Sequence, residues 1–226
     1  AAGKLPASSA SLARELLHAT AEQLDATRAG RSQLVNAWYQ LALRTGESSD
    51  LRSMFDVSGF DPANPGSEAA STWAVIGTAY QSLGRPGLAE QALRAALTVD
   101  PDQPDALNNL GYLLVTEDRD LEEAADLASR AVNLGRQRNT NPQTLREYFD
   151  TLGLAYLKLG RSGDAEAAFR EGLSLDPSAS HLAVGLAEAL VAGERFEEAS
   201  SIIADMPDAL PESVASRVQD VRARLR

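Results

Sequence analysis

The sequence predicts an all-α protein built from repeated helical hairpins, and three observations support this fold class. The 226-residue chain is rich in Ala and Leu and has only 5% aromatic residues, a composition that favours closely packed helices over sheets of β-branched side chains. Small residues recur at a spacing close to 34 residues. Turns that contain glycine, and Asp-Pro steps, separate the consecutive helical segments from one another. With 44% apolar residues the chain can bury a substantial core, either as one elongated domain or as two small ones.

Residues 1–47 are predicted to form an N-terminal helical hairpin. Its two segments, 9–28 and 32–45, each bring apolar residues onto one stripe of a helix. The first stripe consists of Leu12, Leu16 and Leu24, and the second of Leu34, Val35, Trp38, Leu41 and Ala42. Because this region lacks the small-residue spacing of the later segments, it is a degenerate first repeat, a separate helical pair or the end of a longer solenoid.

A connector is predicted over residues 48–69. After a short helical segment at 49–55, the stretch SGFDPANPGS contains too much Pro and Gly for regular structure. A loop of this length is unusual within a compact domain. The connector therefore either packs in an ordered way through Phe55 and Phe60 or acts as a hinge at a domain boundary.

The region from residue 70 to residue 207 carries two series of small residues with a nearly constant period. Each member of the first series follows a Leu or an Ile, and the series is Gly77, Gly111, Gly153 and Ala187, separated by 34, 42 and 34 residues. The second series is Ala89, Ala124, Ala165 and Ala199, separated by 35, 41 and 34 residues. The long middle interval indicates an insertion near residues 135–141. Small residues on both helices of a pair let their backbones approach closely, so the two series predict the contact faces of four hairpins.

These positions resemble the tetratricopeptide repeat, which combines an aromatic residue, Leu-Gly and Tyr on one helix with Ala, Phe and Pro on the next. The first copy reads Trp73, Ile76, Gly77, Tyr80, Ala89, Leu93 and Pro101, and the third reads Phe149, Leu152, Gly153, Tyr156, Ala165, Phe169 and Pro177. The second and fourth copies match more weakly. The resemblance covers residues 70–207 and implies a right-handed α-solenoid with units at 70–103, 104–141, 142–178 and 179–207.

Residues 208–226 are predicted to form a helix that caps the stack. Pro211 suits the first turn of such a helix. An apolar stripe follows, consisting of Val214, Val218, Val221 and Leu225. The other face is charged and carries Glu212, Arg217, Asp220, Arg222 and Arg224. We expect this charged face to be the solvated outer surface at the end of the stack.

Composition argues against several functions. A formal charge of −11 and a pI near 4.7 would repel a phosphate backbone, so nucleic acid is not a predicted partner. No stretch suits a membrane span or an intact signal peptide, and the compartment stays open between cytoplasm and periplasm. The chain has no cysteine, and His18 and His181 lie far apart, outside any metal-ligand spacing. Since no phosphate loop or nucleophile elbow occurs either, we predict no catalysis, no cofactor and no metal site, and we assign both histidines to the surface or the groove.

The resemblance also implies a binding groove on the concave side, lined by the first helix of each hairpin. Carried over to this chain, the groove residues are Thr78, Gln81, Asp105, Asn108, Asn109, Tyr112, Glu147, Asp150, Leu154, His181 and Glu188, with Ala74, Val115, Leu157, Val184 and Val191 beside them. These positions include several carboxylates and neither Lys nor Arg. The predicted partner is therefore a basic or amphipathic segment of a protein or peptide.

One subgroup of the family grips a C-terminal carboxylate, and its basic residues have no counterpart here. Asn109 matches that subgroup. The other positions hold Ala74, Thr78, Glu147 and Thr151. An acidic C-terminal tail is therefore disfavoured as a partner. Two assignments stay open, because Asn109 binds either a ligand backbone or water, and Tyr112 is either a binding anchor or a cover for a neighbouring helix.

The leading functional hypothesis is a protein-binding scaffold. Self-assembly into a homo-oligomer is an alternative, because an imperfectly capped stack leaves an apolar end open to another molecule. A further alternative is that the chain serves as the recruitment part of a larger protein, as its start without Met and its irregular first segment suggest. Intrinsic enzyme activity ranks lowest among these interpretations.

Overall fold

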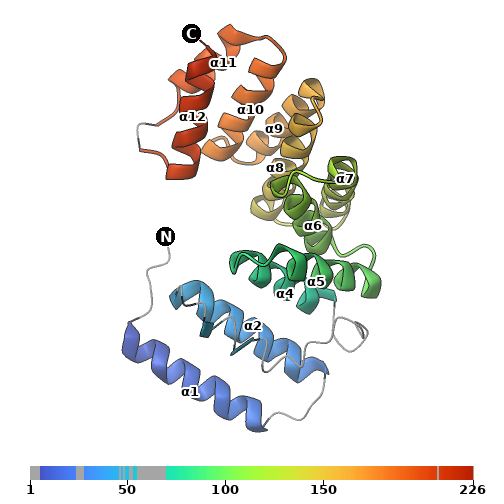
Figure 1. The fold of residues 1–226 in the computed structure, drawn as a ribbon, viewed down its shortest axis with the longest axis vertical. Coiled ribbons are helices and arrows are strands. Elements are labelled where there is room, and N and C mark those ends of the chain that lie inside the picture. Colours follow the sequence, from blue (N-terminus) through green and yellow to red (C-terminus); the bar gives the residue numbers. More distant parts are fainter. Residues whose placement is uncertain are drawn as a thin grey trace. The chain divides into compact units, whose positions relative to one another are not determined.

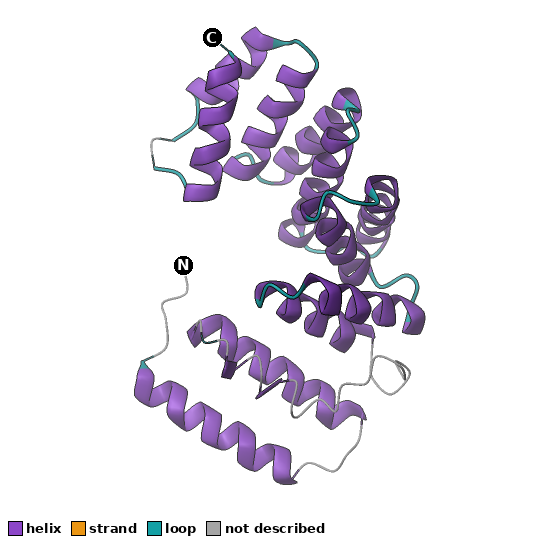
Figure 2. Cartoon of the chain, in the orientation of Figure 1, coloured by secondary structure: helices purple, strands orange, loops and turns teal. Residues whose placement is uncertain are grey.

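The computed structural model describes residues 6–23, 28–45, 47, 49–50, 53–54, 70–207 and 209–225. Within these ranges every regular element is an α-helix, which confirms the predicted fold class (Figures 1 and 2). The helices are α1 (Ala7–Gln23), α2 (Arg28–Thr45), α4 (Ala70–Ser82), α5 (Pro86–Val99), α6 (Pro104–Thr116), α7 (Leu121–Gln137), α8 (Pro142–Lys158), α9 (Ser162–Leu175), α10 (Ser180–Ala192), α11 (Phe196–Ala204) and α12 (Glu212–Arg224). No helix of the described part has both the length and the apolar character needed to cross a bilayer. Leu24 and most of the predicted connector at 48–69 lie outside the described residues.

The chain divides into two compact units, Ala1–Asn109 and Leu110–Arg226, which are described separately. In the first unit α1 contacts α2, α2 contacts α4, and α4 packs along α5. In the second unit α8 contacts α7, α9 and α10, and α10 also contacts α9, α11 and α12. Helices α8, α10 and α12 are thus successive neighbours, and we call them the α8–α10–α12 row. This row carries the candidate site.

The hairpin of α4 and α5 forms around the predicted small residue of its first helix. A Cβ atom at Gly77 would lie 2.6 Å from Cγ of Leu93, which is fully buried. Trp73 and Ile76, on the same helix, are also fully buried. The turn between the helices contains Gly84 with a φ of +66°, a backbone conformation that glycine adopts without steric cost. Both glycines therefore have the roles that the repeat pattern requires.

The N-terminal hairpin forms from α1 and α2, but not through the predicted stripe of α1. Leu12 and Leu16 are 58% and 59% exposed, whereas Ala10 is buried. Arg14 donates two hydrogen bonds to Asp50, from Nε to Oδ1 at 2.5 Å and from Nη2 to Oδ2 at 2.8 Å. Arg14 lies two residues from each leucine, roughly 200° around the helix, so its orientation toward Asp50 turns both leucines outward. The predicted stripe of α2 is buried as expected, with Leu34, Val35, Trp38, Leu41 and Ala42.

The core of the second unit is built around Phe169 of α9. A Cβ atom at Gly153 of α8 would lie 2.6 Å from Cε1 and Cζ of this ring, and a Cβ atom at Gly185 of α10 would lie 2.6 Å from Cε1. Phe169 is fully buried. The ring thus fits between two helices at positions where neither can carry a side chain. Gly153 was predicted for this role, whereas Gly185 was not.

The extra residues of the second repeat lengthen helices instead of forming a long loop. Helices α7 and α8 each contain 17 residues, compared with 14 in α9. Residues 138–141 are all that separate α7 from α8. The insertion predicted near 135–141 therefore lies at a short junction, and its first residues belong to α7.

The predicted C-terminal cap is helix α12. Val214, Val218 and Val221 are buried, and Leu225 packs against the same core. Helix α10 contacts α8 on one side of the sequence and α12 on the other, so α12 is the last helix of the α8–α10–α12 row. Arg217, which was predicted on the outer face of this helix, lies against Glu188 of α10.

Candidate binding site

The predicted groove residues belong to both units. The first unit contains Thr78, Gln81, Asp105, Asn108 and Asn109. The second unit contains Tyr112, Glu147, Asp150, Leu154, His181 and Glu188. In each unit some of these side chains contact one another.

In the first unit, polar side chains of α4 and α6 bond to each other. Asn109 donates from Nδ2 to Oγ1 of Thr78 at 2.9 Å, and Asn108 donates from Nδ2 to Oδ1 of Asn109 at 3.2 Å. Asn108 is buried, Gln81 is half-buried and Asp105 is exposed. Since the amide of Asn109 already has two partners within the chain, this set is less suited to bind a ligand backbone than the sequence suggests.

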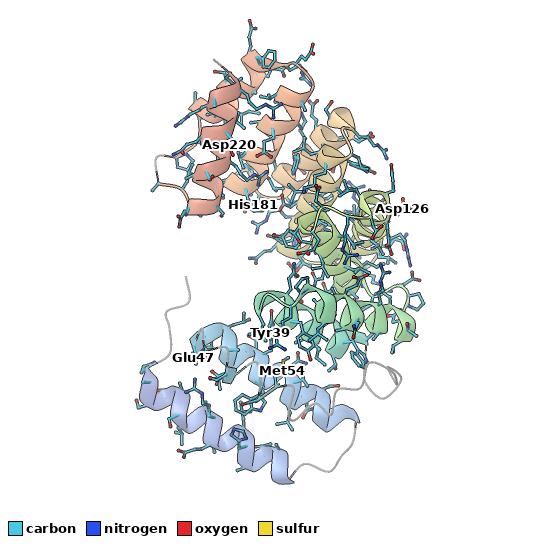
Figure 3. All side chains as sticks on the ribbon, in the orientation of Figure 1. Tyr39, Glu47, Met54, Asp126, His181 and Asp220 are labelled. Carbon is cyan, nitrogen blue, oxygen red and sulfur yellow. The ribbon has the colours of Figure 1, made fainter. Side chains whose placement is uncertain are left out.

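In the second unit, four predicted residues gather on the α8–α10–α12 row. Glu147 and Asp150 are three residues apart on α8, a spacing that places both carboxylates on one helix face. His181 is the second residue of α10 (Figure 3). Glu188 lies further along that helix. Nε2 of His181 lies 3.9 Å from Oε2 of Glu147. The contact between α8 and α10 therefore joins residues that are distant in sequence.

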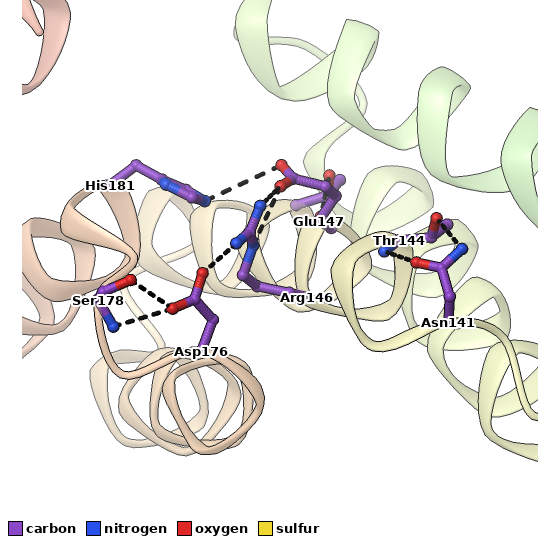
Figure 4. A network of polar contacts seen from close by, with 8 residues as sticks. Asn141, Thr144, Arg146, Glu147, Asp176, Ser178 and His181 are labelled. Carbon is purple, nitrogen blue, oxygen red and sulfur yellow. Dashed lines mark hydrogen bonds and ion pairs between the residues drawn. The ribbon is translucent and has the colours of Figure 1, made fainter. Parts of the chain in front are cut away.

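The start of α8 is defined by Asn141 and Pro142. Oδ1 of Asn141 accepts a hydrogen bond from the backbone N–H of Thr144 at 2.9 Å, as a helix N-cap does (Figure 4). Pro142 then occupies the first helical position, where its missing N–H costs nothing. This cap fixes the first turns of α8 and with them the positions of Glu147 and Asp150.

Arg146 connects the start of α8 to the end of α9. Its guanidinium forms ion pairs with Oε1 of Glu147, at 2.6 Å, and with Oδ2 of Asp176 (Figure 4). Oδ1 of Asp176 in turn accepts hydrogen bonds from the backbone N–H and the hydroxyl of Ser178. Hydrogen bonds from Ser178, followed by those from Arg146, hold the pKa of Asp176 below its ordinary value, although burial opposes them. Both ion pairs of Arg146 are therefore made with carboxylates of this chain.

Arg217 of α12 corrects the sequence-based interpretation of the cap. Its Nε and Nη2 donate to the two carboxylate oxygens of Glu188 at 2.9 and 2.6 Å, a paired geometry that strengthens the contact. From the charge pattern Arg217 was predicted on the solvated face, and the predicted groove contained no basic residue. Arg217 is three residues after Val214 and four before Val221, so the helical period places it beside the packed stripe. That spacing is the signal which would have identified it.

The surroundings of Asp150 shift its pKa. Burial raises its pKa, while the nearby His181 and Arg217 act against that shift and the like charges of Glu147 and Glu188 add to it. Oδ1 of Asp150 and Nε2 of His181 are both shielded from solvent, and neither has a hydrogen-bond partner within the described residues. Ligand atoms of Glu147, Asp150 and His181 all lie within 4.8 Å of one another. The cluster is therefore suited to bind a cation.

The two remaining predicted residues flank this cluster. Leu154 is half-buried and packs against the core of the second unit. Tyr112 is 39% exposed and follows Gly111 on α6, where a Cβ atom would lie 3.6 Å from Cγ2 of Thr151 on α8. Its role as a contact for a ligand stays a prediction.

Comparison with known proteins places this architecture in a family. Models that describe the tetratricopeptide repeat match residues 75–142 and residues 156–225. These two ranges together include α5 to α7, α9 to α12 and parts of α4 and α8. No curated protein sequence matches the chain.

Solved structures show the same fold at low sequence identity. PilF of Pseudomonas aeruginosa has a TM-score of 0.61 at 24% identity, and the match covers 86% of this chain and 87% of PilF. PilW, described as a widely conserved type IV pilus biogenesis factor, has a TM-score of 0.67 at 22% identity, with 85% and 86% covered. MamA from Desulfovibrio magneticus has a TM-score of 0.56 at 16% identity, with 85% and 96% covered. The small residues at the predicted contact positions, the matching family models and these likenesses of fold agree: the chain belongs to the tetratricopeptide repeat family.

Proposed function

We propose that this chain is a protein-binding scaffold whose α8–α10–α12 row accepts a basic or amphipathic segment of a partner protein. One observation carries the proposal: the guanidinium of Arg217 is already held by both carboxylate oxygens of Glu188 on this row, at 2.9 and 2.6 Å. An arginine of a partner binds a carboxylate with the same paired geometry. This contact within the chain supports the proposal that the face binds an arginine of a partner.

The charge that remains on the row favours a basic partner. Arg146 compensates part of the charge of Glu147, and Arg217 compensates Glu188. Asp150 receives no hydrogen bond at Oδ1 from any described residue. A lysine or arginine that reaches Asp150 would relieve the cost of burying this carboxylate, which is the cost that raises its pKa. Tyr112 beside the cluster offers an aromatic surface for the apolar part of an amphipathic segment.

The proposal is tested with an array of 15-residue peptides of varied net charge, probed with the full chain in a buffer that contains a metal chelator. We expect the bound peptides to be rich in Lys and Arg. A labelled peptide from the bound set should then bind the Asp150→Asn variant about tenfold more weakly, as measured by fluorescence anisotropy. The matched control is Glu197→Gln, which removes an exposed carboxylate from α11 and should leave the affinity unchanged.

Loss of binding in this variant cannot be attributed to unfolding. Because burial raises the pKa of Asp150, its ionised form costs stability at neutral pH, and the neutral Asp150→Asn variant should be at least as stable as the wild type. A thermal melt checks this point. Bound peptides that are mainly acidic, or equal affinities of wild type and Asp150→Asn, would contradict the proposal.

Self-assembly is a second candidate, and an apolar surface at α11 favours it. Phe196 is 47% exposed and lines a surface hollow together with Leu225. A second copy of the chain that covered this ring would bury apolar area. Light scattering over a hundredfold range of concentration tests the candidate. A constant monomer mass would exclude it, and a dimer that Phe196→Ser dissociates would support it.

A further inference from the structure

We propose that Glu147, Asp150 and His181 form a binding site for a transition-metal ion of the zinc class. The proposal goes beyond the binding of a partner segment and does not depend on it, because the metal ion alone is the ligand. No metal site was predicted from the sequence, where Asp150 and His181 are 31 positions apart and belong to different repeats. Only the packing of α8 against α10 brings the three residues together.

The arrangement of the donor atoms suits a small ion. One carboxylate oxygen from each acid and one imidazole nitrogen all lie within 4.8 Å of one another, and Nε2 of His181 is 3.9 Å from Oε2 of Glu147. In a tetrahedral zinc site with bonds of about 2.0 to 2.2 Å, donor atoms are about 3.3 to 3.6 Å apart. Shifts of about 1 Å at the ends of these side chains would reach that geometry. Three protein ligands would leave a fourth position for water.

A second, independent observation is that two of the donors lack partners. Oδ1 of Asp150 and Nε2 of His181 are shielded from solvent, and no described residue forms a hydrogen bond with either atom. Buried polar atoms are nearly always satisfied in folded proteins. Of the four such side-chain atoms in the described part of the chain, the two in the second unit belong to this cluster, and both are atom types that bind zinc. A metal ion between them would satisfy both atoms at once.

The surrounding charges balance a divalent ion. Four carboxylates, those of Glu147, Asp150, Asp176 and Glu188, face two guanidiniums, those of Arg146 and Arg217. These six groups sum to a charge of −2, which one divalent ion neutralises. The arginines also hold the side chains in place, because Arg146 binds Oε1 of Glu147 and leaves Oε2 directed at His181 (Figure 4). Such supporting contacts orient metal ligands in known sites.

The ligand set selects the type of metal. Imidazole together with carboxylates suits zinc and the late first-row transition metals, whereas calcium and magnesium take oxygen ligands alone. Because the chain has no cysteine and only two histidines, a nitrogen-containing site in the second unit requires His181. This scarcity makes the proposal directly testable.

The experiment uses the full chain without any affinity tag and measures Zn²⁺ binding by competition with a chromophoric chelator. We expect one Zn²⁺ per chain, with no competition from millimolar Mg²⁺ or Ca²⁺. His181→Gln and Asp150→Asn should each weaken binding at least about tenfold. His18→Gln, which replaces the other histidine, is the matched control and should bind like the wild type. In proton NMR, Zn²⁺ should shift the imidazole signals that disappear in His181→Gln.

Several results would overturn the proposal: no Zn²⁺ bound by the wild type, equal affinity in His181→Gln, or a loss of binding in His18→Gln. Far-UV circular dichroism of each variant checks that the helices are retained. Since the peptide assay described above contains a chelator, a failure of the metal site leaves the proposed partner binding untouched, and the reverse also holds.

Discussion

The α8–α9 hairpin of the second unit and the α1–α2 hairpin of the first unit are stabilised by different means. In the former, the buried ring of Phe169 packs directly against Gly153 and Gly185. In the latter, α1 contributes the charged side chain of Arg14, which bonds to the buried Asp50, while Leu12 and Leu16 point outward. One hairpin depends on apolar packing at a small residue, and the other on a polar contact.

The difference shows what the repeated small residue does. Glycine on the first helix lets an aromatic ring of the second approach the backbone, and apolar packing then suffices. Helix α1 has no glycine, so its apolar side chains cannot pack in this way. Its attachment instead requires Asp50, which accepts hydrogen bonds from Arg14 and, at 2.6 Å, from the hydroxyl of Thr45. Helical hairpins in this chain are thus stabilised by two different kinds of contact.

Among the substitutions that test this difference, removal of the Phe169 ring should lower the free energy of unfolding most. We expect Phe169→Ala to lower the free energy of unfolding by about 4 kcal/mol, because it leaves a cavity between two glycines that offer no side chain to fill it. Urea unfolding followed by far-UV circular dichroism measures the change. Phe196→Ala removes the same ring from an exposed position of the same unit and should cost less than about 1 kcal/mol. Equal losses in the two variants would show that Phe169 does not hold the hairpin together.

Addition of a methyl group at Gly153 tests the close approach itself. The new Cβ would lie 2.6 Å from a ring that also lies close to the backbone of Gly185, so Gly153→Ala should destabilise by about 2 kcal/mol. Gly163, near the start of α9, is the matched control, because no described atom lies within 4 Å of a Cβ there. Gly163→Ala should stabilise by up to about 1 kcal/mol through its helix propensity. Opposite signs in the two variants are the expected result, and a shared sign would contradict the interpretation.

The stability that the contact between Arg14 and Asp50 contributes to the first unit should depend on pH. Burial alone would raise the pKa of Asp50, but hydrogen bonds from Arg14 and Thr45 outweigh it and lower the pKa below its ordinary value. An acid with a lowered pKa contributes stability above its unfolded pKa and loses it as the pH falls through the folded value. Asp50→Asn should therefore unfold at lower urea than the wild type at neutral pH, and the difference should shrink below about pH 4.

Tryptophan fluorescence measures this effect in the first unit, since Trp38 and Trp73 are the two tryptophans of the chain and both lie there. Glu15→Gln, which removes an exposed carboxylate next to Arg14, is the control and should unfold like the wild type at every pH. A difference between Asp50→Asn and the wild type that grows as the pH falls would have the wrong sign for a lowered pKa.

Much of the fold could be predicted because repeat constraints are local. The partners Gly77 with Leu93 and Gly153 with Phe169 lie within single hairpins, so their spacing in the sequence reveals the contact. Gly185 could not be recognised from the same register, which assigns the small position of the fourth copy to Ala187. It packs against the preceding hairpin and not its own. The repeat pattern could not predict the orientation of α1 either. This orientation depends on the ion pair of Arg14 with Asp50, which lies at the start of the connector.

The candidate site was predictable residue by residue but not as a cluster. The family resemblance identified Glu147, Asp150, His181 and Glu188 as neighbours of the groove, yet their mutual contacts depend on how α8 packs against α10. Arg217 was missed because its charge suggested a solvated face, whereas its spacing from the buried valines of α12 places it beside the packed stripe. Charge pattern and helical period disagreed at this position, and the period was right.

The smallest change in the free energy of unfolding is expected from substitutions on the exposed face of α1. Leu12 and Leu16 bury little area, so replacing both with Gln should change the free energy of unfolding by less than about 0.5 kcal/mol per residue. Leu17, half-buried on the same helix, is the matched comparison, and Leu17→Gln should cost about 1 kcal/mol. Urea unfolding followed by tryptophan fluorescence reads both changes. A larger loss at Leu12 and Leu16 than at Leu17 would mean that these leucines are buried in solution and that the polar contact of Arg14 does not orient α1.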